Sequence, residues 1–221
     1  MTQQSWYVDH VPVSPFQMNA WVCGDAETGD GVLIDAGADP HKLMAMIERS
    51  GLTIHAILQT HAHLDHAGAI KPLKDGLLNR PVYVHREEMP IYDTVALSAQ
   101  MFGMGAVPQP PPPDHFVEHD QILTFGSLSA RVIFLPGHTP GGVAYVIGPH
   151  IFVGDTLFMG SVGRTDLPLG DTPTLVESLK RLMQEDDALV VHSGHGPDTT
   201  IGRERQQNPF VQAALRGQIW S

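Results

Sequence analysis

The chain has 221 residues, a length that suits one domain over residues 1–221 with a sizeable core. Its 13 Lys and Arg face 24 Asp and Glu, for a formal net charge of −11, which argues against nucleic acid or an anionic membrane as partner. The single cysteine, Cys23, excludes an internal disulfide framework and a thiolate-rich structural zinc site. We expect Cys23 to be a small buried hydrophobe.

Targeting and membrane signals are missing from the sequence. Residues 1–16 contain no Lys or Arg and no apolar run of signal-peptide length. No stretch approaches the ~20 apolar residues that a membrane span requires. We therefore expect a cytoplasmic protein, and the sequence carries no sign of its oligomeric state.

The first third of the chain predicts strands at 5–9, 17–24 and 31–35, joined by turn-type residues into an antiparallel ribbon. A helix should follow, capped by Asp39, with Pro40 in its first turn and Gly51 just past its end. A short apolar run predicts a buried strand at 54–58. Residues 67–70 predict a short helix, and 82–85 a further strand.

Residues 86–105 are loosely helical and rich in Met, and residues 108–113 are nearly all Pro. A proline run cannot be helix or inner strand. The segment 89–113 therefore has two interpretations. Its flexible Met side chains could line a substrate groove, or it could be a core helix followed by a stiff surface connection.

The second half returns to strands, at 121–125, 128–135, 142–147 and 150–154, whose tight spacing predicts antiparallel pairing. Thr172 should cap a helix with Pro173 in its first turn, and a strand should follow at 188–191. This order of elements predicts an α/β protein with two sheets packed face to face and helices outside.

The densest functional signal is the seven-residue stretch 60–66, which contains His61, His63, Asp65 and His66. Each buried polar group needs a partner, and one cation satisfies several at once. Residues two apart in extended chain point the same way, so His61 and His63 can share one metal. If Asp65 then starts a helix, as Asp often does, its carboxylate and His66 can turn toward a second position.

Three more candidate ligands follow predicted strands in the second half: His138, Asp155 and His195. In each case an apolar strand ends and a glycine permits a sharp turn before the ligand-type side chain. One such residue alone is typical of a structural hydrogen bond, but together with the 60–66 cluster they predict a metal centre. His192 could be either a structural residue at a strand end or a support for a ligand.

These motifs carry a resemblance to the metallo-β-lactamase fold hydrolases and, among them, to the glyoxalase II (hydroxyacylglutathione hydrolase) group. It covers most of the chain and rests on THAHLDH at 60–66, PGHTPG at 136–141, GDTLF at 154–158, GSVGRTDLPLGD at 160–171 and GHGPDTT at 194–200. It implies a four-layer αββα sandwich with two mixed sheets. It also divides the candidate ligands between two metal positions: His61, His63 and His138 for one, Asp65, His66 and His195 for the other, and Asp155 as the bridge.

Nitrogen and oxygen ligands without thiolate suit zinc, with iron or manganese as alternatives. Two such ions ~3.5–4 Å apart lower the pKa of a shared water and make hydroxide the nucleophile. The resemblance implies hydrolysis of a thioester such as S-lactoylglutathione to lactate and glutathione. Asp65 would also orient the nucleophile or take its proton. Arg164 matches a family position that contacts the glycine carboxylate of glutathione, unless it forms an ion pair with Asp166.

Other functions stay open at this point. A mononuclear-iron persulfide dioxygenase would use only His61, His138 and Asp155 as ligands. A lactonase or β-lactam hydrolase and an electron-carrying module are further alternatives. The longer glyoxalase II proteins contact glutathione through a helical carboxy-terminal domain that we expect this chain to lack, so the substrate could be a broader or smaller thioester.

Overall fold

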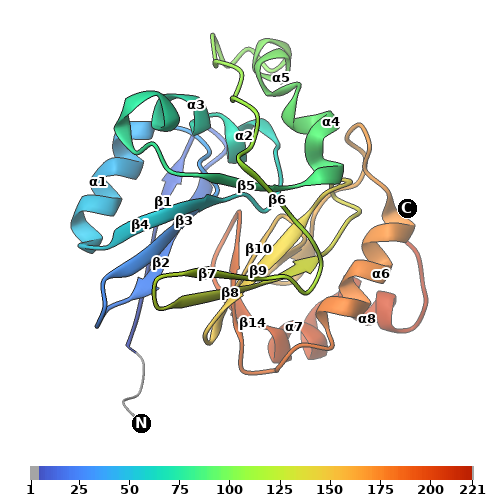
Figure 1. Ribbon diagram of the computed structural model, residues 1–221. Coiled ribbons are helices and arrows are strands. Elements are labelled where there is room, and N and C mark those ends of the chain that lie inside the picture. The colour runs from blue at the N-terminus through green and yellow to red at the C-terminus, as the bar shows by residue number, and fades with distance from the viewer. Residues whose placement is uncertain (1–4, 221) are drawn as a thin grey trace.

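The computed structural model describes residues 5–220. Residues 1–4, part of the segment searched above for a targeting signal, lie outside the described residues, as does residue 221. Two mixed sheets pack face to face, and helices cover both outer surfaces (Figure 1). This arrangement confirms the predicted four-layer α/β sandwich. No helix within residues 5–220 is both long enough and apolar enough to cross a membrane.

The first sheet has the order β1-β2-β3-β4-β5-β6. Its first three strands form the predicted antiparallel ribbon, and β3 to β6 run parallel. The parallel strands direct their carboxyl ends, and the loops that leave them, toward one edge of the sheet. The strand bounds are Trp6–Val13, Met18–Asp25, Asp30–Ile34, Thr53–Leu58, Val82–His85 and His115–Val117.

The second sheet has the order β14-β13-β10-β9-β8-β7. The pairs β7/β8, β8/β9 and β9/β10 are antiparallel as predicted, and β10 pairs with β13 in parallel. A small hairpin of β11 (Leu157–Phe158) and β12 (Ser161–Val162) follows β10. From β7 to β10 the bounds are Ile122–Phe125, Leu128–Phe134, Val143–Ile147 and His150–Gly154, with β13 at Val190–Ser193 and β14 at Thr199–Thr200.

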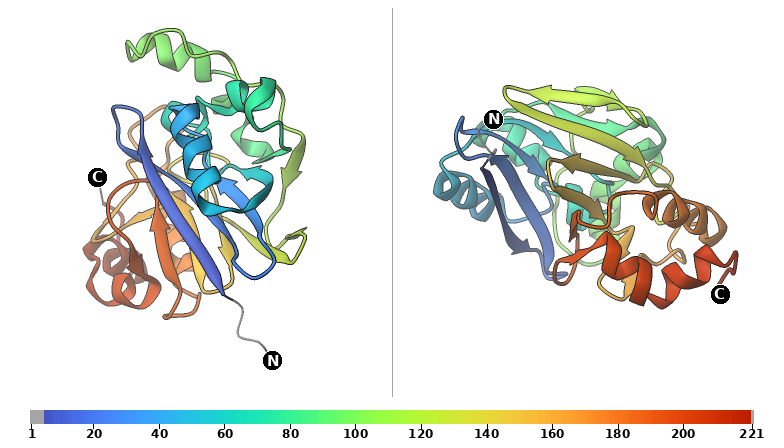
Figure 2. Two further views of the ribbon diagram at one scale, coloured as in Figure 1. Left: turned by 90° about the vertical axis from the view of Figure 1, so that its left-hand side faces the viewer. Right: turned by 90° about the horizontal axis from the view of Figure 1, so that it is seen from below.

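The helices form two outer layers, seen from two further sides in Figure 2. The amino-terminal layer includes α1 and the short elements near the 60–66 stretch, and the carboxy-terminal layer includes α6, α7 and α8. Their bounds are Pro40–Ser50 (α1), Leu64–Ala67 (α2), Ile70–Pro72 (α3), Leu73–Leu77 (a π-helical turn), Arg86–Glu88 (a 3₁₀ turn), Met89–Tyr92 (α4), Val95–Met101 (α5), Thr172–Leu182 (α6), Ile201–Gln207 (α7) and Pro209–Leu215 (α8).

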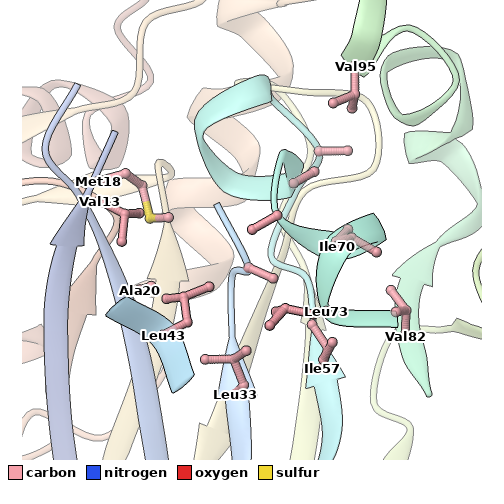
Figure 3. Packing of buried hydrophobic residues seen from close by; sticks show 14 of the residues in the cluster. Val13, Met18, Ala20, Leu33, Leu43, Ile57, Ile70, Leu73, Val82 and Val95 are labelled. Carbon is pink, nitrogen blue, oxygen red and sulfur yellow. The ribbon is translucent and has the colours of Figure 1, made fainter. Parts of the chain in front are cut away.

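Three apolar clusters hold these layers together. Leu43 of α1 and Ile57 of β4 belong to the cluster between the first sheet and its helices (Figure 3). Cys23 and Tyr145 belong to the cluster between the two sheets, and Leu179 of α6 to the one beneath the carboxy-terminal helices. Each of the five is fully buried, so the expectation for Cys23 is confirmed. Every face of both sheets is therefore covered, as burial of their apolar side chains requires.

The helix caps differ from the prediction at two places: the cap of α1 lacks its side-chain hydrogen bond, and the cap of α6 is one residue earlier than predicted. The helix α1 begins at Pro40 as predicted, with Asp39 as the residue before it. The Asp39 side chain makes no capping hydrogen bond to the helix backbone, and its Oδ2 accepts from Ser14 N at 3.2 Å and from Lys42 Nζ at 2.8 Å. The cap of α6 is Asp171, which accepts from Thr174 N at 2.8 Å, while Thr172 is the first helical residue.

Three further predictions need correction, two of them around the 60–66 stretch. Asp65 is the second residue of α2 and does not start it, since His63 is the residue before the helix. The helix predicted at 67–70 is interrupted, because α2 ends at Ala67 and α3 begins at Ile70. The strand predicted at 188–191 is shifted, since β13 begins at Val190.

Candidate metal centre

The candidate ligands lie on loops at one end of the sandwich. His61 and His63 follow β4, and α2 carries His66. In the second sheet β8, β10 and β13 run in one direction, because β9 is antiparallel to both of its neighbours. Their carboxyl ends therefore meet at the same edge, where His138 follows β8. Asp155 follows β10 directly, and His195 follows β13 after Gly194.

The first group consists of His61, His63 and His138, with one ligand atom from each lying within 4.8 Å of the others. The Nδ1 atom of His63 is 3.0 Å from Nε2 of His138. The other ring nitrogens are held by protein: Nδ1 of His61 lies 3.1 Å from Thr60 Oγ1, and Nδ1 of His138 lies 2.7 Å from the Arg164 carbonyl oxygen. These contacts leave Nε2 of His61 and His138 directed toward the centre of the group.

The second group consists of Asp65, His66 and His195, again within 4.8 Å. Oδ2 of Asp65 is 3.2 Å from Nε2 of His195. His66 is fully buried, and its Nδ1 lies 2.8 Å from Oδ2 of Asp35. An imidazole that donates Nδ1–H to a carboxylate presents its Nε2 lone pair to a metal.

Asp155 lies between the two groups. Its Oδ1 is 3.3 Å from Nε2 of His66, and its Oδ2 is 3.6 Å from Nε2 of His195 and 3.7 Å from Nε2 of His138. One carboxylate thus faces ligands of both groups. This is the position that a bridge between two cations requires.

Buried polar atoms test whether the centre suits metal. Among the described residues, His61 Nε2, His66 Nε2 and Asp155 Oδ1 are buried without a hydrogen-bond partner. An unpaired buried polar atom costs ~1–3 kcal/mol, so three in one place call for a ligand that satisfies them together. A nitrogen and oxygen set without thiolate fits zinc, iron or manganese. The structure thus brings together all seven predicted ligands, and their metal-binding role stays a prediction.

The pKa values follow from the density of charge at this centre. Burial, with neighbouring imidazoles, lowers the pKa of His61, and it lowers that of His63 to about 4. Burial also disfavours the charged form of His66, but Asp155, Asp35 and Asp65 outweigh it and raise the pKa of His66 well above its ordinary value. Burial acts against ionisation of Asp155 too, yet His66 and other imidazoles keep its pKa low. The centre therefore holds ionised carboxylates.

Asp35 supports this centre and was missed in the sequence. Its Oδ1 accepts from Thr60 N at 2.7 Å, and its Oδ2 accepts from Thr60 Oγ1 at 2.7 Å and contacts His66. It also lies within 4.8 Å of His61 and His66 ligand atoms, but its oxygens are already engaged, so we interpret it as a support. A φ of 58° directs it there from the end of β3.

Glu88 is a second support that the sequence did not reveal. It is fully buried, and its two oxygens accept from Ala62 N and Gly141 N, each at 2.8 Å. Burial raises its pKa to about 7. This carboxyl ties the loop that holds His61 and His63 to the loop that holds His138.

Gly194 permits the close approach of the last loop. A Cβ atom at this position would lie 2.2 Å from Asp155 Oδ1 and 2.6 Å from His66 Cε1. Any larger residue would displace the bridge or the imidazole. The glycine is thus needed to bring His195 up to the centre.

The contacts of Arg164 and His192 bear on the two roles predicted for each of them. Arg164 forms a bidentate pair with Asp166, with both N–O distances at 2.6 Å. His192 stacks on Phe152, and its Nε2 lies 2.9 Å from His150 Nδ1. We interpret His192 as a structural residue of β13, since neither of these partners belongs to the ligand groups.

A cavity of about 470 Å³ opens over the centre, with ligands of both groups in its floor. The Met-rich and Pro-rich segment reaches this cavity and also enters the core, but none of its described Met side chains lines the cavity over the centre. Ser98 and Phe102 line this cavity, while Tyr92 and Val95 are buried in the core. The segment also contributes Met104 to an adjacent cavity of about 190 Å³.

Known proteins resemble this chain over nearly its whole length. A family model described as Metallo-beta-lactamase superfamily matches residues 13–195. The protein named Hydroxyacylglutathione hydrolase GloC, from Haemophilus influenzae, is 33% identical over 209 residues, covering 93% of this chain and 98% of its own.

Two solved structures share the fold. TTHA1623, solved in a di-iron-bound form, is 45% identical with a TM-score of 0.83, covering 91% of this chain and 99% of its own. The BLEG-1 B3 metallo-beta-lactamase is 36% identical with a TM-score of 0.85, covering 93% of this chain and 99% of its own.

Proposed function

Because this chain belongs to the metallo-beta-lactamase superfamily, we propose that it is a hydrolase that uses two divalent cations, zinc or iron, to cleave a thioester. The observation that carries the proposal is the pair of ligand groups that meet at Asp155, with buried atoms of both facing inward. A hydroxyacylglutathione hydrolase among the relatives supports thioester chemistry, and a di-iron-bound relative supports two metals.

In the proposed mechanism, His61, His63 and His138 would hold one cation, Asp65, His66 and His195 would hold the other, and Asp155 would contribute to both. Two such cations, when bound, lower the pKa of water to near neutrality and polarise a carbonyl group. Thr60, Asp35 and the Arg164 carbonyl orient three of the imidazoles by engaging their second nitrogens. These contacts hold the ligand nitrogens in position before substrate binds.

Asp65 is suited to handle the proton of the attacking water. Although its burial favours the neutral form, His66 and His195 outweigh that effect and lower its pKa, so it is ionised at neutral pH. It also lines the cavity. Attack forms the new C–O bond, the C–S bond breaks, and the sulfur leaves as thiolate. A thiol has a pKa near ~8.5, so no strong acid is needed for departure.

Two other functions, a mononuclear-iron dioxygenase and a β-lactam hydrolase, differ in how well the structure and the comparisons support them. A mononuclear dioxygenase that used His61, His138 and Asp155 would leave the second group without a role, although that group converges equally well. β-Lactam hydrolysis has one observation in its favour, the similarity to the BLEG-1 B3 metallo-beta-lactamase. It is therefore our second candidate.

The test combines metal content with turnover in one preparation. Purified protein should contain two metals per chain and hydrolyse S-lactoylglutathione, whereas oxygen uptake on glutathione persulfide should be absent. A penicillin and a cephalosporin assayed in parallel test the second candidate. One iron per chain with oxygen uptake would overturn the proposal, as would turnover of β-lactams alone.

A further inference from the structure

The walls of the cavity above the metal centre are apolar. Six large hydrophobic side chains line it beside the ligands: Phe16, Leu64, Phe102, Phe158, Val162 and Leu167. They come from separate parts of the chain, the β1–β2 loop, α2, the end of α5, the β11–β12 hairpin and the loop before α6. A volume of about 470 Å³ lies within the ~300–1,000 Å³ of small-ligand pockets.

Three phenylalanines line the cavity, and two of them, Phe16 and Phe102, are exposed. Phe16 and Phe102 are 45% and 60% exposed, and their ring centroids lie 6.3 Å apart at an interplanar angle of 83°. Phe158 lies 6.2 Å from the ring of His195. Exposed aromatic groups gathered around a concave site are typical of a surface that binds an apolar partner.

Positive charge for an ionic substrate is scarce at this cavity. Of the described residues that line it, Arg164 alone has a permanently cationic side chain. Its guanidinium is already engaged by Asp166 through two contacts of 2.6 Å, and both side chains are mostly exposed. Glutathione carries two carboxylates. The one guanidinium available to pair with them, that of Arg164, is already paired with Asp166.

From this chemistry we infer that the cavity selects a thioester with an aromatic or branched apolar acyl group. A glutathione thiol would not strengthen the binding of such a substrate. The inference rests on the proposed thioester hydrolysis. Apolar burial contributes about 25 cal/mol per Å², and the exposed surface of Phe16 and Phe102 supplies such area. A lactoyl group is small and hydroxylated, so it would leave the exposed surface of these two phenylalanines in contact with water.

A set of four substrates separates the acyl preference from the thiol preference. Phenylacetyl and lactoyl groups are each joined to glutathione and to N-acetylcysteamine. We expect kcat/KM to be at least tenfold higher for phenylacetyl than for lactoyl on either thiol. For a given acyl group, exchange of glutathione for N-acetylcysteamine should change kcat/KM less than about threefold.

Variants at the rim assign the effect to the cavity. Phe102→Ala should lower kcat/KM about tenfold for the phenylacetyl substrates, in line with the loss of much of one buried aromatic contact, and leave the lactoyl substrates almost unchanged. Phe102→Leu should restore most of the loss. Leu97→Ala is the matched control, since Leu97 is 55% exposed on the same helix and does not line the cavity.

The outcomes distinguish this inference from the proposed function. Higher activity on both glutathione thioesters, or an equal effect of Phe102→Ala on all four substrates, would overturn the inference and leave thioester hydrolysis standing. Calorimetry with nonhydrolysable thioether counterparts measures binding without turnover. Tight binding of the phenylethyl thioethers without hydrolysis of any thioester would support the cavity assignment and overturn the proposed function, whereas no preference in either measurement would overturn the inference.

Discussion

Replacement of Asp35 by Asn should weaken metal binding through a change of imidazole tautomer. The carboxylate makes three contacts, with Thr60 N and Thr60 Oγ1 at 2.7 Å and with His66 Nδ1 at 2.8 Å. An Asn oxygen can still accept from Thr60 N. The amide nitrogen then takes the place of Oδ2, where it can donate to the Thr60 hydroxyl and to an unprotonated Nδ1 of His66.

That exchange moves the imidazole proton of His66 to Nε2, the atom that faces Asp155. A metal at the second position must then compete with a proton for this nitrogen. Loss of a carboxylate that orients a ligating imidazole typically costs 10–100-fold in metal affinity, which corresponds to about 1.4–2.7 kcal/mol. The Asn side chain can still make both hydrogen bonds to Thr60, so Asp35→Asn should remain folded.

Metal titration by calorimetry, together with metal content after dialysis, measures the effect. Asp30→Asn is the matched control, because Asp30 pairs with a histidine outside the centre, His55, at 2.7 Å. It should bind two metals with wild-type affinity. If Asp35→Asn were folded by circular dichroism and bound both metals as tightly as the wild type, the reasoning would be refuted.

Three further predictions concern Asp155 between the two ligand groups, the stability of the protein at low pH, and the ion pair at the rim of the cavity. Asp155→Ala should lose activity and retain fewer metals per chain by elemental analysis, and retained activity would show that Asp155 is no bridge. The backbone N–H of Ser127 and other donors hold the pKa of Asp30 down at about 2, so its contribution to stability is present above the unfolded pKa of ~3.9 and is lost as pH falls toward 2. Asp30→Asn should therefore show a flatter fall in melting temperature between pH 4.5 and 2.5, and parallel curves would contradict this. Asp166→Asn releases the Arg164 guanidinium and should raise kcat/KM for the glutathione thioesters relative to the N-acetylcysteamine thioesters; an equal change for both would argue against it.

Strands and ligand loops could be predicted because local patterns specify them. Apolar runs mark β4 and β13, and a glycine before each later ligand marks the turn. Helix starts were less well predicted because two capping residues can stand side by side. At Asp171 and Thr172 the chain offers both, and backbone geometry chooses Asp171.

The supporting residues could not be predicted for a different reason. Asp35 and His66 are 31 positions apart, and Glu88 and Ala62 are 26 apart. No local pattern distinguishes these two acids from ordinary surface acids. Only the pairing of β3 with β4, and of β4 with β5, brings each carboxyl to its partner. Contacts of this kind depend on the assembled sheet, as does the apolar character of the cavity.

The centre and the cavity walls have separate origins in the chain. Ligands arise at strand ends, where the sheets themselves determine direction, and Asp35 and Glu88 fasten their loops to neighbouring elements. Phe16 and Phe102, in contrast, come from a hairpin loop and a helix end, which can change without disturbing a strand. Reaction type and substrate choice are thus encoded in different parts of the molecule. A relative can therefore share all seven candidate ligands with this chain and still select a different substrate, because nothing in the candidate metal centre constrains these two phenylalanines.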